Sequence, residues 1–307
     1  MVKLPGAVMA LFRAHFDIVE STAGDHLAQI SSASPDILLC SVGSTRLGAG
    51  AIAALPASVK VIATYSVGHD HVDLDAARLR SIAVFYTPGV LADSVADSAL
   101  LLLLGAARRA TESIALIRSR AWTGWHPDQL LGVELRGKRL GIFGMGEIGR
   151  RIARRASAFG MTIAYTNRRR VPEDTEALFV PDPRDLLRDS DVFLLACPST
   201  PETRGFINFS TLMLAKESLI IVNTGRGDLV QDDALIDALL HRRILAAGLD
   251  VFNDEPAIDT RYFALPNAFI LPHIGSSTFE ARIGMGQALV SAVCAWSAGE
   301  HAPNRLV

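Results

Sequence analysis

Residues Arg139-Leu-Gly-Ile-Phe-Gly-Met-Gly-Glu-Ile-Gly149 decide how this chain is expected to fold. An apolar run ends in glycines at positions 144, 146 and 149, and a helical pattern follows over residues 148–159. The first glycine permits a tight turn, the second lets a pyrophosphate approach the backbone, and the third lets helix and strand pack closely. Because a helix N-terminus attracts phosphate, we interpret the stretch as a dinucleotide-binding turn, in preference to a glycine-rich turn without a ligand. The expected cofactor contacts in this turn are Gly144, Met145, Gly146, Glu147, Ile148 and Gly149.

Strand-like runs alternate with helical patterns on both sides of this turn, which is typical of parallel α/β architecture. The runs cover residues 37–40, 60–64, 83–86, 139–143, 162–166, 192–196, 219–222, 245–249 and 269–271. At about 150 residues per domain, the 307 residues suggest two domains. We expect an α/β fold of two Rossmann-like or flavodoxin-like parallel-sheet domains with a cleft between them. A substrate-binding domain would span residues 1–98, completed by a C-terminal helix within residues 280–307, and a dinucleotide-binding Rossmann domain would span residues 99–279.

An apolar segment separates the two patterns. Residues 93–118 are expected to form one long helix that is apolar nearly all round at Leu100–Leu104. Such a helix is buried between layers or in a subunit interface. In the arm that follows, Trp122 and Trp125 either close a partner subunit's site or pack the arm itself. Together the helix and the arm suggest a homodimer.

Composition and charge exclude several classes of protein. Hydrophobic residues make up 50% and charged residues 20%, which fits a chain with a well-formed core. The net charge of −2 excludes a broadly basic nucleic-acid surface, and the apolar stretch at 99–107 is too short to span a bilayer. Three cysteines without a CxxC spacing suggest a reducing compartment and argue against a disulfide framework or a zinc site. We therefore expect a cytoplasmic protein without metal, nucleic-acid or membrane partners.

The residues after the second expected strand of the cofactor domain bear on which nicotinamide cofactor binds. NAD-binding sites usually place an acidic residue about 20 positions after the glycines, where it accepts bonds from the ribose 2′-OH. Here Asn167 takes that place, and Arg168 and Arg169 follow. Asparagine does not repel a 2′-phosphate, and arginine offers a planar fork of donors suited to phosphate. We expect NADP(H) to be preferred over NAD(H), with a solvated basic loop as the alternative.

Several further motifs end expected strands, where ligands bind in open parallel sheets. They are Val222-Asn-Thr-Gly-Arg-Gly-Asp-Leu-Val230, Gly248-Leu-Asp-Val-Phe-Asn-Asp-Glu-Pro256 and Leu271-Pro-His-Ile-Gly-Ser-Ser-Thr278. Earlier in the chain lie Ser66-Val-Gly-His-Asp-His-Val-Asp73, Thr87-Pro-Gly-Val-Leu91 and Cys197-Pro-Ser-Thr-Pro-Glu-Thr203. With the glycine turn, these motifs resemble the D-isomer-specific 2-hydroxyacid dehydrogenase family over nearly the whole chain. Within it, the chain looks most like the glyoxylate/hydroxypyruvate and hydroxyphenylpyruvate reductases.

The resemblance implies three catalytic roles. His273 would be the acid–base group that protonates the carbonyl oxygen of a 2-keto acid, as a histidine titrating near neutrality is able to do. Glu255 would hydrogen-bond His273 and favour its charged form. Arg226 would bind the substrate carboxylate through its bidentate fork. Taken singly, each of these residues also fits a structural role.

Other positions carry over from the same resemblance. The backbone at Val67 and Gly68 would bind the substrate carboxylate from the first domain, with His69 and His71 beside it as surface residues. Asp250 would lie near the nicotinamide or simply end its strand, and Cys197 would pack and not act as a nucleophile. The remaining expected cofactor contacts are Cys197, Pro198, Thr203, Thr224, Gly225, Asp250 and Gly275.

The sequence thus predicts an NADPH-dependent reductase of small 2-keto acids, glyoxylate and hydroxypyruvate above all. A family member acting on a bulkier aryl pyruvate or on phosphoglycerate is one alternative. A non-catalytic protein of the same fold that senses NAD(P), like the transcriptional co-repressors that share it, is another, because fold does not dictate function.

Overall fold

The computed structural model describes residues 4–21, 26–41, 46–171, 176–302 and 304–307. The chain divides into two compact units, which are described separately: unit 1 comprises Met1–Leu91 with Ser276–Val307, and unit 2 comprises Ala92–Gly275. The expected boundary at 98/99 falls inside helix α5 (Ala92–Ala107), so the whole helix belongs to unit 2.

Unit 2 is built on a seven-stranded parallel sheet with the strand order β10-β9-β8-β7-β4-β5-β6. The strands are β4 (Arg139–Phe143), β5 (Thr162–Thr166), β6 (Leu178–Phe179), β7 (Val192–Leu195), β8 (Ile220–Asn223), β9 (Ala246–Leu249) and β10 (Ala268–Ile270). The strand order reverses between β4 and β7, and ligands bind at such a switch point in doubly wound sheets. The expected strands are all present, whereas β6 is a two-residue edge strand too short to show an alternating pattern.

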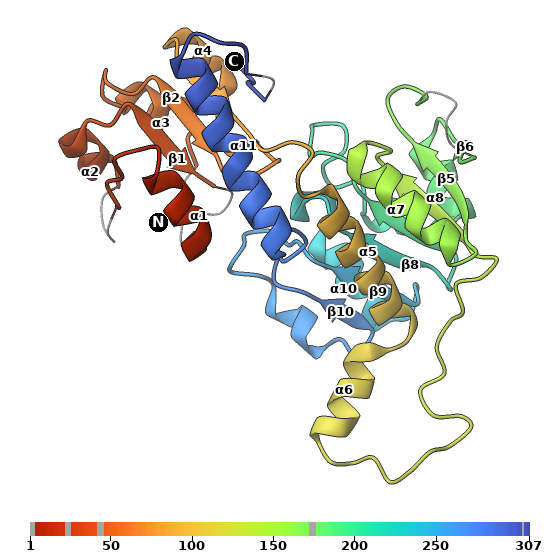
Figure 1. Cartoon of the computed structure of the whole chain (residues 1–307). Coiled ribbons are helices and arrows are strands. Elements are labelled where there is room, and N and C mark those ends of the chain that lie inside the picture. The colour runs from red at the N-terminus through yellow and green to blue at the C-terminus, as the bar shows by residue number, and fades with distance from the viewer. Residues whose placement is uncertain (1–3, 22–25, 42–45, 172–175, 303) are drawn as a thin grey trace. The chain divides into compact units, whose positions relative to one another are not determined.

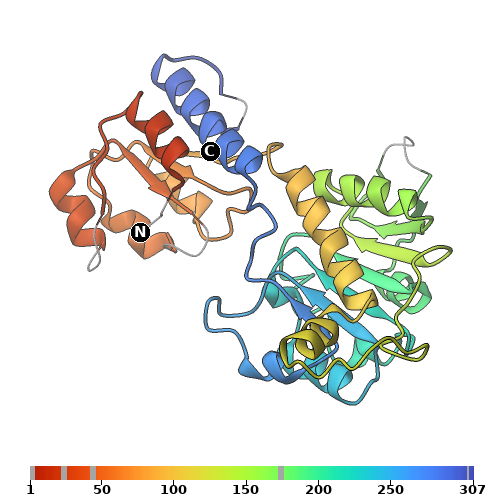
Figure 2. The same cartoon turned by 60° about the horizontal axis from the view of Figure 1, so that its bottom comes forward.

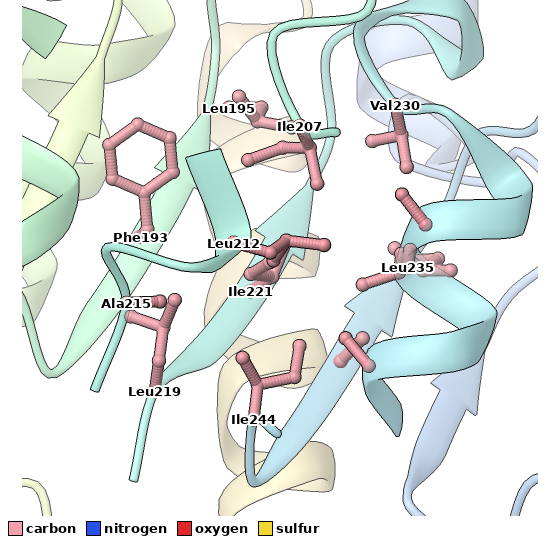
Figure 3. Close-up of a cluster of buried hydrophobic side chains, with 14 of the residues drawn as sticks. Phe193, Leu195, Ile207, Leu212, Ala215, Leu219, Ile221, Val230, Leu235 and Ile244 are labelled. Atoms are coloured by element: carbon pink, nitrogen blue, oxygen red, sulfur yellow. The ribbon is translucent and has the colours of Figure 1, made fainter. Parts of the chain in front are cut away.

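Helices cover both faces of this sheet, as Figure 1 shows. Helices α5 and α7 (Glu147–Ala158) pack on one face, and α8 (Pro183–Asp189), α9 (Phe209–Leu212) and α10 (Asp232–Leu240) pack on the other. Strand β7 contributes to both cores because its side chains alternate. Phe193 and Leu195 face α9 and α10 (Figure 3), and Leu194 faces α5. Each such buried side chain contributes about 1.5–3 kcal/mol to folding, so a strand that is apolar throughout stabilises both layers.

The expectation of a single long helix over residues 93–118 is wrong, because the segment forms two helices. Helix α5 ends at Ala107 and α6 spans Ala110–Arg118, with Arg109 in the left-handed region at φ 54°. The carbonyl of Ala107 accepts the N–H of Val133 at 2.9 Å and not one from a continuing helix, which ends α5 there. Leu101 is 49% exposed, so the apolar stretch of α5 is not buried all round.

Unit 1 contains a three-stranded parallel sheet of β1 (Ile37–Cys40), β2 (Val61–Thr64) and β3 (Ala83–Phe85), in that order. Its helices are α1 (Gly6–Arg13), α2 (His26–Ala33), α3 (Ala49–Ala54), α4 (Leu74–Leu79) and α11 (Phe279–Ser297). Helix α11 packs beside α1 (Figure 2), and the Thr278 side chain caps its N-terminus by accepting the N–H of Ala281. In the described ranges no helix is at once long and apolar enough to cross a membrane.

Candidate active site

Three neighbouring strands of unit 2 carry the side chains expected to do the chemistry. Arg226 follows β8, Glu255 lies in the loop after β9, and His273 follows β10. Strands β8, β9 and β10 are adjacent and parallel, so their carboxyl ends meet at one edge of the sheet (Figure 1). The topology therefore brings together three groups that lie far apart in the sequence.

His273 and Glu255 form a direct pair. The Nδ1 of His273 lies 2.6 Å from Oε2 of Glu255, and the other carboxylate oxygen accepts the N–H of Phe252 at 2.8 Å. An ionised carboxylate only accepts, so Nδ1 carries the hydrogen and Nε2 points to the other side of the ring. His273 itself takes the left-handed conformation at φ 54°, a backbone state that residues other than glycine adopt rarely and often at functional sites.

The charge of Glu255 is set by its neighbours. Burial by itself raises the pKa of this carboxyl, but the hydrogen bonds from His273 and the Phe252 N–H and the charges of His273 and Arg226 outweigh burial. The pKa of Glu255 is therefore held below its ordinary value. The group is ionised at neutral pH and is able to orient the imidazole.

The Arg226 turn is held by a residue that the sequence reasoning missed. The fully buried side chain of Asn223 accepts the N–H of Gly225 at 3.0 Å and donates to the carbonyl of Arg226 at 2.9 Å. A Cβ on Gly227 would lie 2.0 Å from the backbone of Phe252, so the Arg226 turn packs directly on the loop that leads to Glu255. An asparagine at the end of a buried strand, just before glycines, is a turn signal that could have identified Asn223.

Asp250 fixes the backbone on the far side of His273. Its carboxylate accepts the N–H of Ile274 at 2.8 Å and of Gly275 at 2.7 Å. Burial raises the pKa of Asp250, and those two N–H bonds oppose the rise. The position of residues 273–275 thus depends on a carboxylate 2% exposed at the end of β9.

The glycine turn has the shape that a dinucleotide needs. Gly144 has φ 111°, and a Cβ there would lie 2.6 Å from the backbone nitrogen of Cys197. A Cβ on Gly149 would lie 2.2 Å from the carbonyl oxygen of Gly144, whereas nothing lies within 4 Å of one on Gly146. Helix α7 begins after Gly146 without a side-chain cap, so its first N–H groups stay available for phosphate. These features fit a bound dinucleotide.

Asn167 is tied to this turn. Its Oδ1 accepts the backbone N–H of Met145 at 2.9 Å, which leaves the amide NH₂ group as the part of the side chain that is able to meet a ligand. The following loop is held at its other end, because the Val171 N–H donates to the hydroxyl of buried Tyr165 at 3.1 Å. Arg168 and Arg169 are exposed between these anchors.

The loop after β7 lies beside the glycine turn at the switch point. Thr203 donates its hydroxyl proton to the carbonyl of Pro198 at 2.8 Å and accepts the Thr200 N–H, which closes the loop. Burial raises the pKa of the Cys197 thiol to about 12, so Cys197 is a packed, protonated thiol at neutral pH. The Thr224 hydroxyl donates to the carbonyl of Leu195 at 3.4 Å, which links the β8 turn to the same edge.

In unit 1, Val67 and Gly68 follow β2 in a half-buried loop. Among the described residues, no protein group accepts the N–H of Val67, Gly68 or His69. The expectation that His71 lies at the surface is wrong: the residue is 8% exposed, and its ring bonds to the Thr64 hydroxyl. A polar run such as 68–71 is usually solvated, but here Val72 pairs with Leu47 and His71 is buried next to it.

Comparisons with known proteins identify the family to which the sequence is related. Residues 100–275 match the family described as D-isomer specific 2-hydroxyacid dehydrogenase, NAD binding domain. The chain is 41% identical to a glycerate dehydrogenase of Hyphomicrobium methylovorum over 92% of this chain and 90% of that protein. It is 38% identical to a glyoxylate reductase of Thermococcus onnurineus over 98% and 93%.

Among solved structures, the chain resembles an NADPH-dependent glyoxylate/hydroxypyruvate reductase of Sinorhizobium meliloti, determined in complex with NADP and malonate. The TM-score is 0.89 at 31% identity, over 99% of this chain and 94% of that one. The likeness covers residues of both units. The chain is a member of the D-isomer specific 2-hydroxyacid dehydrogenase family.

Proposed function

We propose that this dehydrogenase is an NADPH-dependent reductase of small 2-keto acids, glyoxylate and hydroxypyruvate above all. The observation that carries the proposal is the 2.6 Å contact between His273 Nδ1 and Glu255 Oε2 beside the Arg226 turn. Such a pair presents an imidazole with one nitrogen held and the other directed at a reacting oxygen. A cofactor-sensing protein would not need this arrangement.

The residues divide the reaction between them. Arg226 binds the carboxylate and polarises the adjacent carbonyl through its fixed, always-charged fork. Nε2 of His273 gives its proton to the carbonyl oxygen in reduction and takes one from the hydroxyl in the reverse direction. When bound, the reduced nicotinamide supplies the hydride that the carbonyl carbon accepts. Asp250 keeps residues 274–275, and with them the imidazole, in place.

Contacts within the glycine turn support a preference for NADPH. The Asn167 oxygen is already taken by the Met145 N–H, so the side chain offers donors where the ribose 2′ group would lie. A phosphate only accepts hydrogen bonds, and the exposed fork of Arg168 adds a positive charge beside it. The NADPH dependence named for the Sinorhizobium meliloti relative agrees with this assignment.

We propose a second carboxylate-binding site at the backbone N–H groups of Val67 and Gly68. Consecutive backbone N–H groups that have no acceptor among the described residues are able to bind a carboxylate. We assign these backbone groups the role of binding a carboxylate of the substrate.

The proposal is tested by a matrix of initial rates. Glyoxylate, hydroxypyruvate, phenylpyruvate and 3-phosphohydroxypyruvate are each offered with NADPH and with NADH, and the absorbance of the reduced cofactor is followed. We expect the highest kcat/KM with NADPH and the two small acids. Higher kcat/KM with phenylpyruvate or the phosphorylated acid would favour the bulkier-substrate alternative, and no turnover with any acid would favour a sensing role.

A homodimer in a reducing, cytoplasmic setting completes the proposal. Large apolar side chains on α5, on α6 and in the following arm are exposed, namely Leu101, Ile114, Ile117, Trp122 and Trp125. A second copy of the chain would cover such a patch. Light scattering coupled to gel filtration measures the expected mass of about twice 32.9 kDa.

A further inference from the structure

A chain of polar groups in unit 1 connects a buried histidine to the backbone of the Val67–Gly68 loop. Nε2 of His71 lies 2.9 Å from Oγ1 of Thr64, and that oxygen lies 2.6 Å from Oγ of Ser66. The Ser66 hydroxyl donates to the carbonyl of Gly68 at 2.6 Å. Thr64 is fully buried, and Ser66 and His71 are each 8% exposed, so water does not replace these bonds.

The bond from Ser66 to the carbonyl of Gly68 determines which atom is the donor in each of the other hydrogen bonds. A hydroxyl has one proton to donate, and Ser66 gives its proton to a carbonyl that only accepts. Thr64 must therefore donate to Ser66, and its own oxygen must accept from His71. Nε2 of His71 consequently carries a hydrogen. Cys40, whose sulfur lies 3.8 Å from that nitrogen, stays a neutral thiol because burial raises its pKa to about 12.

This series of hydrogen bonds determines how the peptide groups of the loop are oriented. The bond from Ser66 holds the carbonyl of Gly68 inward. In a trans peptide the following N–H, that of His69, points the opposite way. The N–H groups of Val67, Gly68 and His69 thus remain without a described protein acceptor, in a conformation suited to an anion.

The ring of His71 is not needed to hold its own backbone. The carbonyl of His71 accepts the Leu47 N–H at 2.7 Å, and Val72 pairs with Leu47. These bonds would survive replacement of the imidazole. Nε2 of the ring makes polar contacts to Thr64 and Cys40, which points to a role beyond filling space.

We propose that His71 is a positioning residue for substrate binding, which acts through the hydroxyls of Thr64 and Ser66 to keep the Val67–His69 N–H groups turned toward a carboxylate. The inference rests on the proposed function for the identity of that anion, a 2-keto acid. In this role His71 acts indirectly, through two hydroxyl groups, and not by contact with substrate or cofactor.

The test compares two replacements of His71. His71→Gln places an amide N–H near the position of Nε2, whereas His71→Leu fills similar space without a donor. Thr64→Val and Ser66→Ala break the chain at its other links and leave the imidazole in place. Ile62→Val, a buried change on the same strand β2, serves as the matched control for loss of packing.

Each variant is assayed for KM and kcat with glyoxylate, for binding of oxamate, a non-reducible analogue of a 2-keto acid, for NADPH binding and for Tm. We expect His71→Leu, Thr64→Val and Ser66→Ala to raise KM and the oxamate Kd about tenfold, the effect of losing one buried hydrogen bond. NADPH binding should be unchanged and kcat should stay within about threefold, and His71→Gln should restore most of the loss. The proposal is overturned if His71→Leu behaves like Ile62→Val, or if KM, kcat and NADPH binding all deteriorate in step with Tm.

A spectroscopic measurement separates this inference from the proposed function. Nitrogen-15 NMR of histidine-labelled protein should show hydrogen on Nε2 of His71, and a neutral ring with hydrogen on Nδ1 alone would refute the chain even if no variant folds. If wild type reduces no 2-keto acid, the proposed function fails. The proposed role of His71 would still be supported if Nε2–H is observed and if His71→Leu, but not His71→Gln, shifts the amide signals of residues 67–69.

Discussion

The side-chain oxygen of Asn167 accepts the backbone N–H of Met145 at 2.9 Å, although the two residues are 22 positions apart in the sequence. This bond joins the end of β5 to the glycine turn after β4, and it orients the asparagine so that its NH₂ group is the part left for a ligand. An aspartate at this position would offer a charge that repels phosphate and only acceptor atoms.

The double change Asn167→Asp with Arg168→Ala should therefore reverse the cofactor preference. We expect the ratio of kcat/KM for NADPH to that for NADH to fall about 10²-fold, because a charge-assisted bond is lost and a repulsion is gained. Arg154→Ala, which removes an exposed arginine from α7, is the control and should leave the ratio unchanged. A wild-type enzyme that already prefers NADH would refute the assignment.

Replacement of His273 by alanine should remove the proton donor while leaving the phosphate site intact. We expect kcat to fall about 10²–10⁴-fold, the range for loss of a general acid, with the Kd for NADPH changed less than about threefold. Fluorescence titration and steady-state rates measure the two quantities. Near-normal kcat at neutral pH would show that another group supplies the proton.

Glu255→Gln should change how stability depends on pH. The pKa of Glu255 is lower in the folded protein than in the unfolded chain, so its ionisation stabilises the fold above the unfolded value of 4.5. This contribution is lost as the pH falls through the lower folded value. The Tm difference between wild type and Glu255→Gln should thus be largest near pH 6–7 and shrink below about pH 4. A difference that is constant with pH would mean that the carboxylate makes no net ionic contribution.

Arg226→Ala should act on substrates that carry a carboxylate. We expect kcat/KM for glyoxylate to fall about 10²–10³-fold, since a bidentate charged contact is lost, and Arg226→Lys should recover only part of it. The comparison substrate is an uncharged aldehyde. Wild-type protein that reduces the aldehyde and the keto acid equally well would argue against a carboxylate clamp.

Two glycines of the turn should respond differently to alanine. At Gly149 the new Cβ would lie 2.2 Å from the Gly144 carbonyl oxygen, so we expect the free energy of unfolding to fall by about 1–3 kcal/mol. At Gly146 nothing lies within 4 Å, so stability should hold while NADPH binding weakens. Denaturant unfolding and cofactor titration check both. Equal effects at the two positions would contradict the separate roles assigned to them.

The sequence alone was enough to identify the architecture. Strands buried on both faces appear in the sequence as unbroken apolar runs such as Val192–Leu195, and glycines 144 and 149 mark a turn in which a side chain would clash. It also indicated the motifs that contain Arg226, Glu255 and His273, because each motif follows a strand end and parallel strands end at one edge. The roles expected for these three residues came from the resemblance of the motifs to a known family. These signals are local in the chain or follow from simple periodicity.

Long-range contacts decided the rest. The break between α5 and α6 depends on a hydrogen bond from Val133 to Ala107, the pairing of Glu255 with His273 depends on two separate loops, and the burial of His71 depends on Leu47. These hydrogen bonds and buried contacts join residues that are far apart in the sequence, and sequence separation does not tell which residues are close in space. Only the tertiary structure therefore shows which polar side chains meet a partner and which are left to meet a ligand.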